Sequence, residues 1–294
     1  MFRIRIQNKK KCIWYCSAVV SFLLFLLLLG WTNHLANTQD AQQMAGRWSE
    51  KKDVAQVSCF FSSKAEVTED TIQSFEYSLK NVLQEASITE TSENPSARLW
   101  VDAYSADGKI TLVNGRNTLD ANAIGIGGDF FLFHPLKLIT GAYFSGNDLM
   151  QDYCIIDQDA AWQLFGSNDV VGMTVYIGNV PHIVTGVVQR PDSRMDKAAG
   201  LNSTVVYVSY ETLEAYGTNN GINHYEIVMP NPVDEFAYGK VKEGIGIDEK
   251  NVEIVENSRR YSLPNRIKTI FAFGTRSMNG KAIIYPYWEN LARG

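Results

Sequence analysis

The sequence predicts an α+β protein with one N-terminal transmembrane helix, followed by an extracytoplasmic split βαβ sandwich that contains a small β-rich inserted subdomain. Three observations predict this fold class. An uncharged apolar run covers residues 12–32. A strand and helix pattern occupies residues 53–126 and resumes at 217–257. A glycine-rich stretch of short strands, residues 127–216, lies between these two segments.

The start of the chain has the composition of a membrane anchor. Five cations in residues 1–11 precede the apolar run Cys12–Thr32, which holds 21 residues without a charge. A helix of about 20 apolar residues crosses a bilayer, and flanking cations stay on the cytoplasmic side. We therefore expect a cytoplasmic tail at 1–11, a transmembrane helix at 12–32, and a cell-membrane protein whose residues after about 33 are extracytoplasmic.

A cleaved secretory signal is the alternative to a retained anchor. A signal peptide has an apolar core of about 7–15 residues and a cleavage site with small residues at alternate positions. The run Ile13–Trp31 is longer and rich in Leu and Phe, and the sites at Ala36 and Ala45 have His34 and Gln43 at the wrong place. A retained anchor is favoured.

The outer part begins with a strand and a helix after a polar connector at 33–52. Val54–Phe61 is a strand candidate. Thr68 then caps a helix that has acidic residues in its first turn. One face of this helix carries apolar residues at helical spacing: Ile72, Phe75, Leu79, Val82, Leu83 and Ala86.

A hairpin is expected next, formed by Leu99–Tyr104 and Lys109–Val113 around Asp107-Gly108. This β-α-β-β series is the start of a split βαβ sandwich. The pattern resumes with a strand at His224–Met229, a short helix, and a strand at Val252–Val255. We therefore expect a second βαβ unit after an insertion.

The insertion contains short strands, many glycines and one predicted helix, at about 159–165, that stops at Gly166. Asp157 and Asp159 are expected to cap this helix. A second hairpin is expected from Thr174–Ile177 and His182–Val188, which flank Gly178-Asn179-Val180-Pro181.

Charge excludes one class of partner. Residues 33–257 carry 15 Lys/Arg and 31 Asp/Glu, whereas residues 258–294 carry seven Lys/Arg and one acid. Nucleic acid binds to cationic surfaces. We therefore expect no nucleic-acid partner.

Chemistry-bearing motifs are not found. Gly141 and Gly146 have the spacing of a phosphate-binding loop, but Asn147 replaces its lysine. The glycines at 125, 127 and 128 lack the following helix of a dinucleotide site, and we expect them at turns. We predict no catalytic residue and no cofactor.

Metal and disulfide sites are likewise not predicted. The histidines, His34, His134, His182 and His224, are isolated from one another and from other ligand types at metal-binding spacing, and we expect no metal cage. His182 and His224 are expected to be ordinary strand residues. Cys59 and Cys154 either pair or remain free buried thiols.

The strongest local signal is a series of structural motifs between residues 128 and 188. Gly128-Asp129-Phe130-Phe131 and Gly141-Ala142-Tyr143-Phe144 precede a helix that ends in Leu164-Phe165-Gly166. Val171-Gly172 follows, then a strand, a turn, and a second strand that contains Gly186-Val187-Val188. This combination resembles the MacB-like periplasmic core domain of ABC-transporter permeases. Under the resemblance Leu164, Phe165, Gly166, Gly172, Gly186 and Val187 are structural positions of the family.

The resemblance implies a permease subunit of an ABC-type exporter. Such a subunit has a membrane helix, a porter-like α/β part, here 53–126 plus 217–257, a β-rich insertion, here 127–216, and three further membrane helices. It transmits motion from a separate or fused ATPase to the outer domain. We therefore expect an ABC ATPase subunit, a second permease copy as homodimer or pair, and the membrane as partners. The chain itself is not expected to be an enzyme.

The end of the chain is expected to approach the bilayer. No further apolar run occurs before Gly294, but Tyr285, Tyr287 and Trp288 with Arg293 are typical of a membrane interface. Residues 258–294 are therefore predicted to form a stalk that returns toward the membrane. The alternative is an aromatic patch that packs on the domain. The alternative function is a single-pass, membrane-anchored extracytoplasmic binding or sensor module.

Overall fold

The computed structural model of the chain describes residues 2–49, 51, 53–89, 98–272 and 281–293. These residues form two compact units, Met1–Gln39 and Asp40–Gly294. The first unit is the helix α1 (Phe2–Asn37). Its stretch Lys11–Asn37 contains an 18-residue window with a mean hydropathy of 2.5 and is, in the described part of the chain, the one helix long and apolar enough to cross a membrane.

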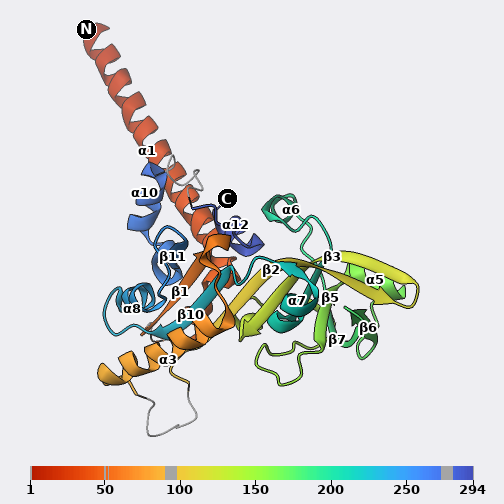
Figure 1. The fold of residues 1–294 in the computed structure, drawn as a ribbon. Helices are drawn as coiled ribbons and strands as arrows, with labels where there is room; N and C mark the ends of the chain where they lie inside the picture. The colour runs from red at the N-terminus through yellow and green to blue at the C-terminus, as the bar shows by residue number, and fades with distance from the viewer. Residues whose placement is uncertain (1, 50, 52, 90–97, 273–280, 294) are drawn as a thin grey trace. The chain divides into compact units, whose positions relative to one another are not determined.

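The second unit contains an 11-stranded sheet with the strand order β11-β1-β10-β2-β3-β8-β5-β7-β4, and with β6 and β9 attached to β2 (Figure 1). The strands are β1 (Val54–Phe61), β2 (Val101–Asn114), β3 (Asn117–Gly128), β4 (Leu138–Gly141), β5 (Tyr153–Asp157), β6 (Thr174–Ile177), β7 (Val180–Val188), β8 (Val205–Ser209), β9 (Thr218–Asn219), β10 (His224–Pro230) and β11 (Val252–Glu256).

Helices pack around this sheet. They are η1 (Asp40–Gln42), α2 (Met44–Trp48), η2 (Ser63–Ala65), α3 (Glu69–Glu85), α4 (Phe130–Phe133), α5 (Gln158–Phe165), α6 (Arg194–Ala199), α7 (Tyr210–Tyr216), α8 (Phe236–Gly244), α9 (Asn257–Arg260), α10 (Leu263–Phe271) and α12 (Tyr287–Arg293).

Two interlocked βαβ units form one end of the sheet. Strand β10 lies between β1 and β2 and is antiparallel to both, so β1 and β2 run parallel and α3 connects them. In the same way β1 lies between β10 and β11, which α8 connects. Each unit therefore places one strand between the two strands of the other. This arrangement confirms the predicted α+β fold class with a split βαβ sandwich.

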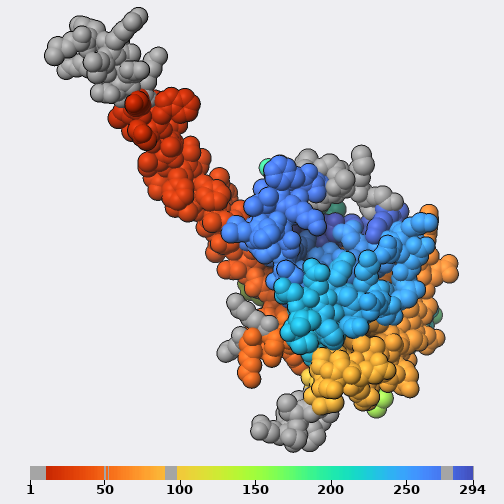
Figure 2. Space-filling view, turned by 90° about the vertical axis from the view of Figure 1, so that its left-hand side faces the viewer, coloured from red at the N-terminus to blue at the C-terminus, as the bar shows by residue number. Residues whose placement is uncertain are grey.

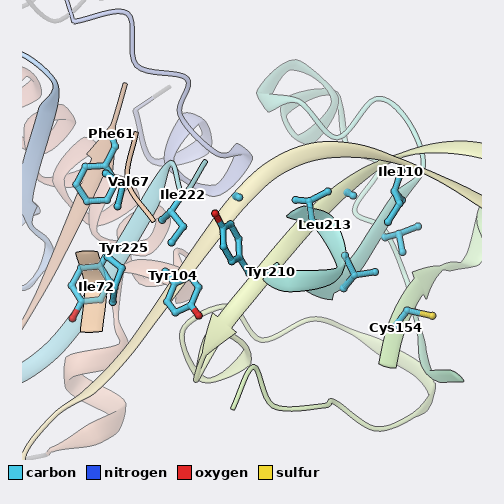
Figure 3. Packing of buried hydrophobic residues seen from close by; sticks show 14 of the residues in the cluster. Phe61, Val67, Ile72, Tyr104, Ile110, Cys154, Tyr210, Leu213, Ile222 and Tyr225 are labelled. Carbon is cyan, nitrogen blue, oxygen red and sulfur yellow. The ribbon is translucent and has the colours of Figure 1, made fainter. Parts of the chain in front are cut away.

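The helices α3 and α8 cover one face of these strands. Ile72, Phe75, Leu79 and Leu83 of α3 are buried, at the positions that the helical spacing predicts. In Figure 2 the orange-to-yellow residues of α3 lie against the light-blue residues of α8, although about 160 positions separate them in the sequence. The core continues along the sheet, and Figure 3 shows it from Phe61 to Cys154.

The β2–β3 hairpin differs from the prediction. No turn forms at Asp107-Gly108, because both residues pair with β3 inside one 14-residue strand. The turn lies at Gly115-Arg116, where Gly115 has a φ of 60°. A Cβ on Gly108 would lie 2.4 Å from the carbonyl oxygen of Thr218 in β9. Gly108 therefore permits the close approach of a third strand, and the Asp-Gly pair is not a turn signal here.

The glycines of β3 were also predicted wrongly as turn residues. Gly125 and Gly127 pair within the strand, opposite Ala106 and Tyr104 of β2. The side chain of Leu213 and the ring of Tyr104 occupy the space that a Cβ would need at these two positions. Only Gly128, with a φ of 66° at the end of β3, has a backbone conformation that favours glycine.

Four short helices, not one, lie between residues 127 and 216. The predicted helix is present as α5, and Gly166 ends it with a φ of 74°. Three further helices, α4, α6 and α7, have four to seven residues each. Such helices are shorter than two turns, so apolar periodicity does not reveal them.

The predicted second hairpin is present as β6 and β7, with Ile177 paired to Val180. Its turn is therefore the two residues Gly178-Asn179, which both have positive φ, as the tightest hairpins require. Cys59 and Cys154 are buried free thiols. Burial raises the pKa of the Cys154 thiol to about 12, so this thiol stays protonated.

Candidate functional site

The family-motif positions lie where α5 packs on the sheet. Leu164 and Val187 are fully buried in the same core cluster. The carbonyl oxygen of Leu164 accepts hydrogen bonds from Asn114 at 3.1 Å and Asn117 at 2.9 Å, which attach the end of α5 to the β2–β3 turn. Leu164 and Val187 therefore have structural roles, in core packing and in the attachment of α5 to the turn.

Among the glycine motif positions, two lie at turns and one lies in a strand. Gly166 donates its N–H to Trp162 and ends α5. Gly172, with a φ of 83°, donates its N–H to the carbonyl of Val184 at 2.8 Å. Gly186 lies in β7 opposite Gly141 of β4. The structure therefore gives these positions contacts within the backbone framework of the β-rich part.

Asp157 caps α5 as predicted, and it does more. Its Oδ1 accepts the N–H of Ala160 at 2.8 Å, and its Oδ2 accepts the N–H of Val205 at 3.0 Å. Arg190 binds both Asp157, at 2.6 Å, and Asp159, at 2.5 Å. This carboxylate therefore connects α5, β8 and the segment after β7.

A second site gathers residues that the sequence left apart. His134 follows α4, and His224 and Glu226 lie two residues apart on β10. The Nε2 atom of His134 lies 2.5 Å from Oε1 of Glu226, and Nε2 of His224 lies 3.9 Å from Oε2. The side chains of all three residues are at most 3% exposed. The prediction that the histidines are isolated is therefore wrong for His134 and His224.

Polar side chains of the two strands beside β10 surround this cluster. Ser58 on β1 and Ser105 on β2 lie opposite Glu226 and His224 in the strand register, so they share one face of the sheet. Ser58 Oγ and Gln56 Nε2 each donate to Glu226 Oε2 at 3.2 Å. Ser105 Oγ lies 3.4 Å from His224 Nδ1.

Aromatic rings close the cluster on its other sides. Trp288 of α12 lies over His134, with ring centroids 4.1 Å apart, and 5.3 Å from His224. Phe60 stacks on His224 at 5.1 Å, and Phe130 lies 4.6 Å from His134. Aromatic side chains therefore cover the ionisable groups of the cluster and shield them from water.

The electrostatics of the cluster favour an ionised carboxylate beside a neutral imidazole. Burial alone would raise the pKa of Glu226, but His134 and His224 hold it below its usual value. Burial is the main cause that lowers the pKa of His224 to about 4. Two imidazole nitrogens and a carboxylate oxygen can share protons or bind a divalent ion.

The sequence contains one signal for this cluster. Residues two apart on a strand point to the same face, so His224 and Glu226 were placed together by the predicted strand. His134 comes from a separate element about 90 residues earlier, and only the packing of α4 brings it close. His182, in contrast, bonds Val180 O and Thr212 Oγ1 at 3.0 and 3.1 Å, and it is an ordinary strand residue as predicted.

The C-terminal aromatic residues differ from the expectation of a membrane interface. Trp288 is 5% exposed and packs on the histidines, and Tyr285 donates a hydrogen bond to Glu253 at 2.6 Å. Apolar side chains are exposed on α10 instead, at Leu263, Ile267, Ile270 and Phe271. Their spacing of four, three and one residues places them on one face of that helix.

Comparison with known proteins gives one consistent result. The MacB-like periplasmic core domain matches residues 20–254 of the chain. The macrolide export ATP-binding/permease protein MacB of Chromobacterium violaceum is 33% identical over 96 residues, 32% of this chain and 14% of that protein. The protein of the same name from Burkholderia thailandensis is 28% identical over 136 residues, 45% of this chain and 20% of that protein. The matched stretches thus span a small part of these relatives.

Two solved structures are similar at low identity. The periplasmic region of MacB from Actinobacillus actinomycetemcomitans has a TM-score of 0.44 and 18% identity, and the match covers 74% of this chain and 92% of that one. The extracellular domain of the noncanonic ABC-type transporter YknZ from Gram-positive bacteria has a TM-score of 0.44 and 16% identity, with coverage of 68% and 99%.

Proposed function

Because the chain belongs to the family with the MacB-like periplasmic core domain, we propose that it is a permease subunit of an ABC-type exporter. In this role it transmits motion from a separate ATPase to its extracytoplasmic domain. The observation that carries the proposal is the extent of the family match. It begins at residue 20, inside the apolar helix α1, and ends at residue 254 in β11, so it includes the second half of the helix and extends through the βαβ units into their last strand.

The proposal assigns a place to each part of the chain. Residues 1–11 are the cytoplasmic tail, 12–32 the membrane helix and 33–52 the connector to the extracytoplasmic domain. The five cations before the apolar run support this orientation.

The outer domain is proposed to have two parts. Residues 53–126 plus 217–257 form the porter-like part, which supplies β1, β2, β9, β10, β11 and nearly all of β3, and residues 127–216 form the β-rich part. The long β2–β3 hairpin supports a mechanical connection between them. Its strand β2 pairs with β10 near one end and with β6 near the other.

Residues 258–294 are proposed to form a stalk at the membrane. The exposed apolar face of α10 supports this assignment, and Arg266 and Lys268 flank that face in the helical projection. The six excess cations of residues 258–294 are suited to the anionic surface of a bilayer. The aromatic residues of α12 pack inside the domain and have no part in this contact.

The partners follow from the same proposal. An ABC ATPase subunit binds on the cytoplasmic side, and a second permease copy completes the assembly as a homodimer or pair. The acidic outer domain, with 31 Asp/Glu against 15 Lys/Arg in residues 33–257, has no affinity for nucleic acid. The catalysis of ATP hydrolysis belongs to the partner.

A photo-crosslinking experiment tests the partner. Benzoylphenylalanine replaces Lys10 in the tail or, as the control, Tyr77, which is 72% exposed on α3 of the outer domain. After irradiation of native membranes, the tail position is expected to link to a protein with a phosphate-binding loop, and the control position is not. The purified assembly is expected to hydrolyse ATP. If neither position links to an ATPase, the chain is a single-pass anchored binding or sensor module.

A reporter experiment tests the orientation separately. Alkaline phosphatase fused after residue 49 is expected to be active, because this enzyme requires the oxidising compartment. A cytoplasmic reporter at the same position is expected to be inactive. The opposite pair of results would place the domain in the cytoplasm and contradict the permease proposal.

A further inference from the structure

We propose that His134, His224 and Glu226 form a binding site for one divalent transition-metal ion of the zinc type. The proposal concerns a site inside the outer domain and does not depend on the permease function. It is carried by the convergence of three ligand atoms, by their lack of hydrogen-bond partners, and by the groups that hold them in place.

The ligand atoms converge on one point. One atom from each of the three residues lies within 4.8 Å of the other two. In a tetrahedral zinc site with bonds of about 2.0–2.1 Å the ligand atoms lie about 3.3 Å apart. His134 Nε2 lies 2.5 Å from Glu226 Oε1, closer than this value, and His224 Nε2 lies 3.9 Å from the other carboxylate oxygen, Oε2, farther than this value. Small rotations of the side chains therefore suffice to surround an ion.

These atoms lack other partners. Within the described part of the chain, Nε2 of His134, Nε2 of His224 and Oε1 of Glu226 are buried and have no partner with hydrogen-bond geometry. This includes the His134–Glu226 pair, whose atoms are 2.5 Å apart but poorly aligned for a hydrogen bond. A buried polar atom without a partner is destabilising. One cation would satisfy all three.

Neighbouring polar groups orient the ligands. Gln56 and Ser58 both donate to Glu226 Oε2, which leaves Oε1 directed at His134. Asn257 in turn donates to Ser58 at 2.8 Å. Ser105 lies beside Nδ1 of His224, so the opposite nitrogen, Nε2, faces the cluster. Metal-binding histidines and carboxylates are held by such outer contacts in the same way.

The donor set selects the class of ion. Two imidazole nitrogens with one carboxylate oxygen are ligands that suit zinc and its neighbours in the transition series. Calcium and magnesium prefer a shell of oxygen ligands, which this cluster lacks.

The surroundings indicate a structural ion. The two histidines are covered by Trp288 of α12, and Phe60 and Phe130 close the sides. An ion here would connect the segment after α4 to β10, beneath the C-terminal helix. It would therefore stabilise the fold, and no reacting substrate is implied.

Metal content and spectroscopy test the site. The full chain, carrying a Strep tag and purified in detergent, is stripped with a chelator and then given ZnCl₂ or CoCl₂. We expect one zinc per chain after desalting, a higher unfolding temperature in zinc, and the visible absorption bands of tetrahedral cobalt. No retained zinc, together with no cobalt bands, would overturn the proposal and leave a buried His–Glu–His ion pair.

Matched variants identify the ligands. His224→Gln and Glu226→Gln are expected to weaken zinc binding at least about 100-fold, more than the loss of an outer-shell contact. Ser105→Ala keeps every ligand and is expected to weaken binding about 10-fold. His182→Gln removes a histidine that bonds Val180 and Thr212 outside the cluster, and this control is expected to bind zinc normally.

The metal-site proposal remains testable even if a ligand variant fails to fold. Circular dichroism identifies such a variant. The site is then tested by the weaker zinc binding expected of Ser105→Ala and by the cobalt spectrum of the unmodified chain. Zinc binding by folded His224→Gln or Glu226→Gln at the affinity of the unmodified chain would contradict the assignment, because the metal would then lie elsewhere.

Discussion

Glycine at three positions of the β2–β3 hairpin makes room for a neighbour. A Cβ on Gly127 would lie 2.0 Å from the ring of Tyr104, its partner on β2. At Gly125 it would lie 2.8 Å from Leu213, and at Gly108 it would meet the backbone of β9. A flexible ring can move aside, but a paired strand cannot move without loss of its hydrogen bonds. Gly108 is therefore the least replaceable of the three.

Gly108→Ala is expected to lower the free energy of unfolding by about 1–3 kcal/mol, the range for overpacked interior sites. Gly239→Ala is the control, because a Cβ there has no atom within 4 Å and the residue lies inside α8. We expect this control to raise stability by about 0.5–1 kcal/mol. Urea unfolding followed by tryptophan fluorescence measures both, and equal effects of the two variants would contradict the packing argument.

Glu76 on α3 makes the free energy of unfolding depend on pH in the range between about 4.5 and 8. Burial, followed by the nearby carboxyl of Asp102, raises its pKa from 4.5 to about 8. The folded chain therefore keeps a proton that the unfolded chain loses above pH 4.5. The stabilisation is complete below that pH and is lost as pH rises through about 8. The charged or titratable groups facing this pair are Glu69, Tyr225, Arg98 and Asp129.

Glu76→Gln is expected to reduce the loss of stability between pH 6 and about pH 9, because the amide cannot ionise. Glu85→Gln, an exposed position at the end of the same helix, is the control and should leave the pH profile unchanged. Unfolding curves at a series of pH values measure the effect. A Glu76→Gln profile with the slope of the unmodified chain would show that this carboxyl is already ionised.

At the scale of elements, α12 is attached by a buried ionic network. Glu289 is 1% exposed and accepts hydrogen bonds from Arg260 at 2.7 and 3.0 Å and from Arg293 at 2.7 Å. Arg293 also binds Glu253 of β11. This network fixes the helix whose Trp288 covers the histidine cluster.

Glu289→Gln is expected to lower the free energy of unfolding by about 3–5 kcal/mol, because it leaves two largely buried guanidinium groups without their shared counter-ion. Glu249→Gln breaks the solvent-exposed pair with Lys242 and is expected to cause no measurable change. Thermal unfolding compares the two. A loss of stability in the control as large as in Glu289→Gln would refute the role of burial.

The elements that sequence patterns predicted best are those with one dominant local signal. The strand β1 has the predicted bounds, and α3 buries four of the six predicted apolar positions, whereas Val82 is half-buried and Ala86 is exposed. The end of α5 at Gly166 and the hairpin of β6 and β7 were also predicted. In each case the cap, the spacing or the turn lies within the element itself, so local sequence suffices.

The features that were missed depend on distant residues. Gly108 looked like a turn because the approach of β9 is invisible from its neighbours in sequence. The cluster of His134, His224 and Glu226 requires α4 to pack on the sheet at β2, which brings His134 beside Glu226 of β10. Trp288 looked like an interfacial residue because its buried place depends on the network around Glu289. Local patterns contain no information on such contacts.

At the scale of the outer domain, one sheet extends through both proposed parts. The strands β2 and β3 reach from the interlocked βαβ units to β6 and β8, and α12 contacts α6 as well as the histidine cluster. A displacement of one part would therefore be resisted by paired backbone. This construction favours transmission of motion over absorption of it, as the permease proposal requires.

The proposed contact of α10 with the bilayer can be tested by fluorescence. Ile270 is 72% exposed, and the other members of its apolar face are at least 54% exposed. An environment-sensitive fluorophore is attached to Ile270→Cys or, as the control, to Tyr77→Cys on α3, which is 72% exposed. Both are made in a Cys12→Ser, Cys16→Ser background, in which the remaining thiols, Cys59 and Cys154, are buried.

In proteoliposomes with anionic lipid, the label at position 270 is expected to shift to the blue and to resist aqueous quenchers, because the apolar face of an amphipathic helix enters the headgroup region. The label at position 77 should remain fully exposed to water. Neutral lipid should weaken the effect, since the cations of residues 258–294 add attraction to an anionic surface. An aqueous spectrum at position 270 in anionic vesicles would exclude a membrane contact at α10, and its apolar face would then belong to a protein interface.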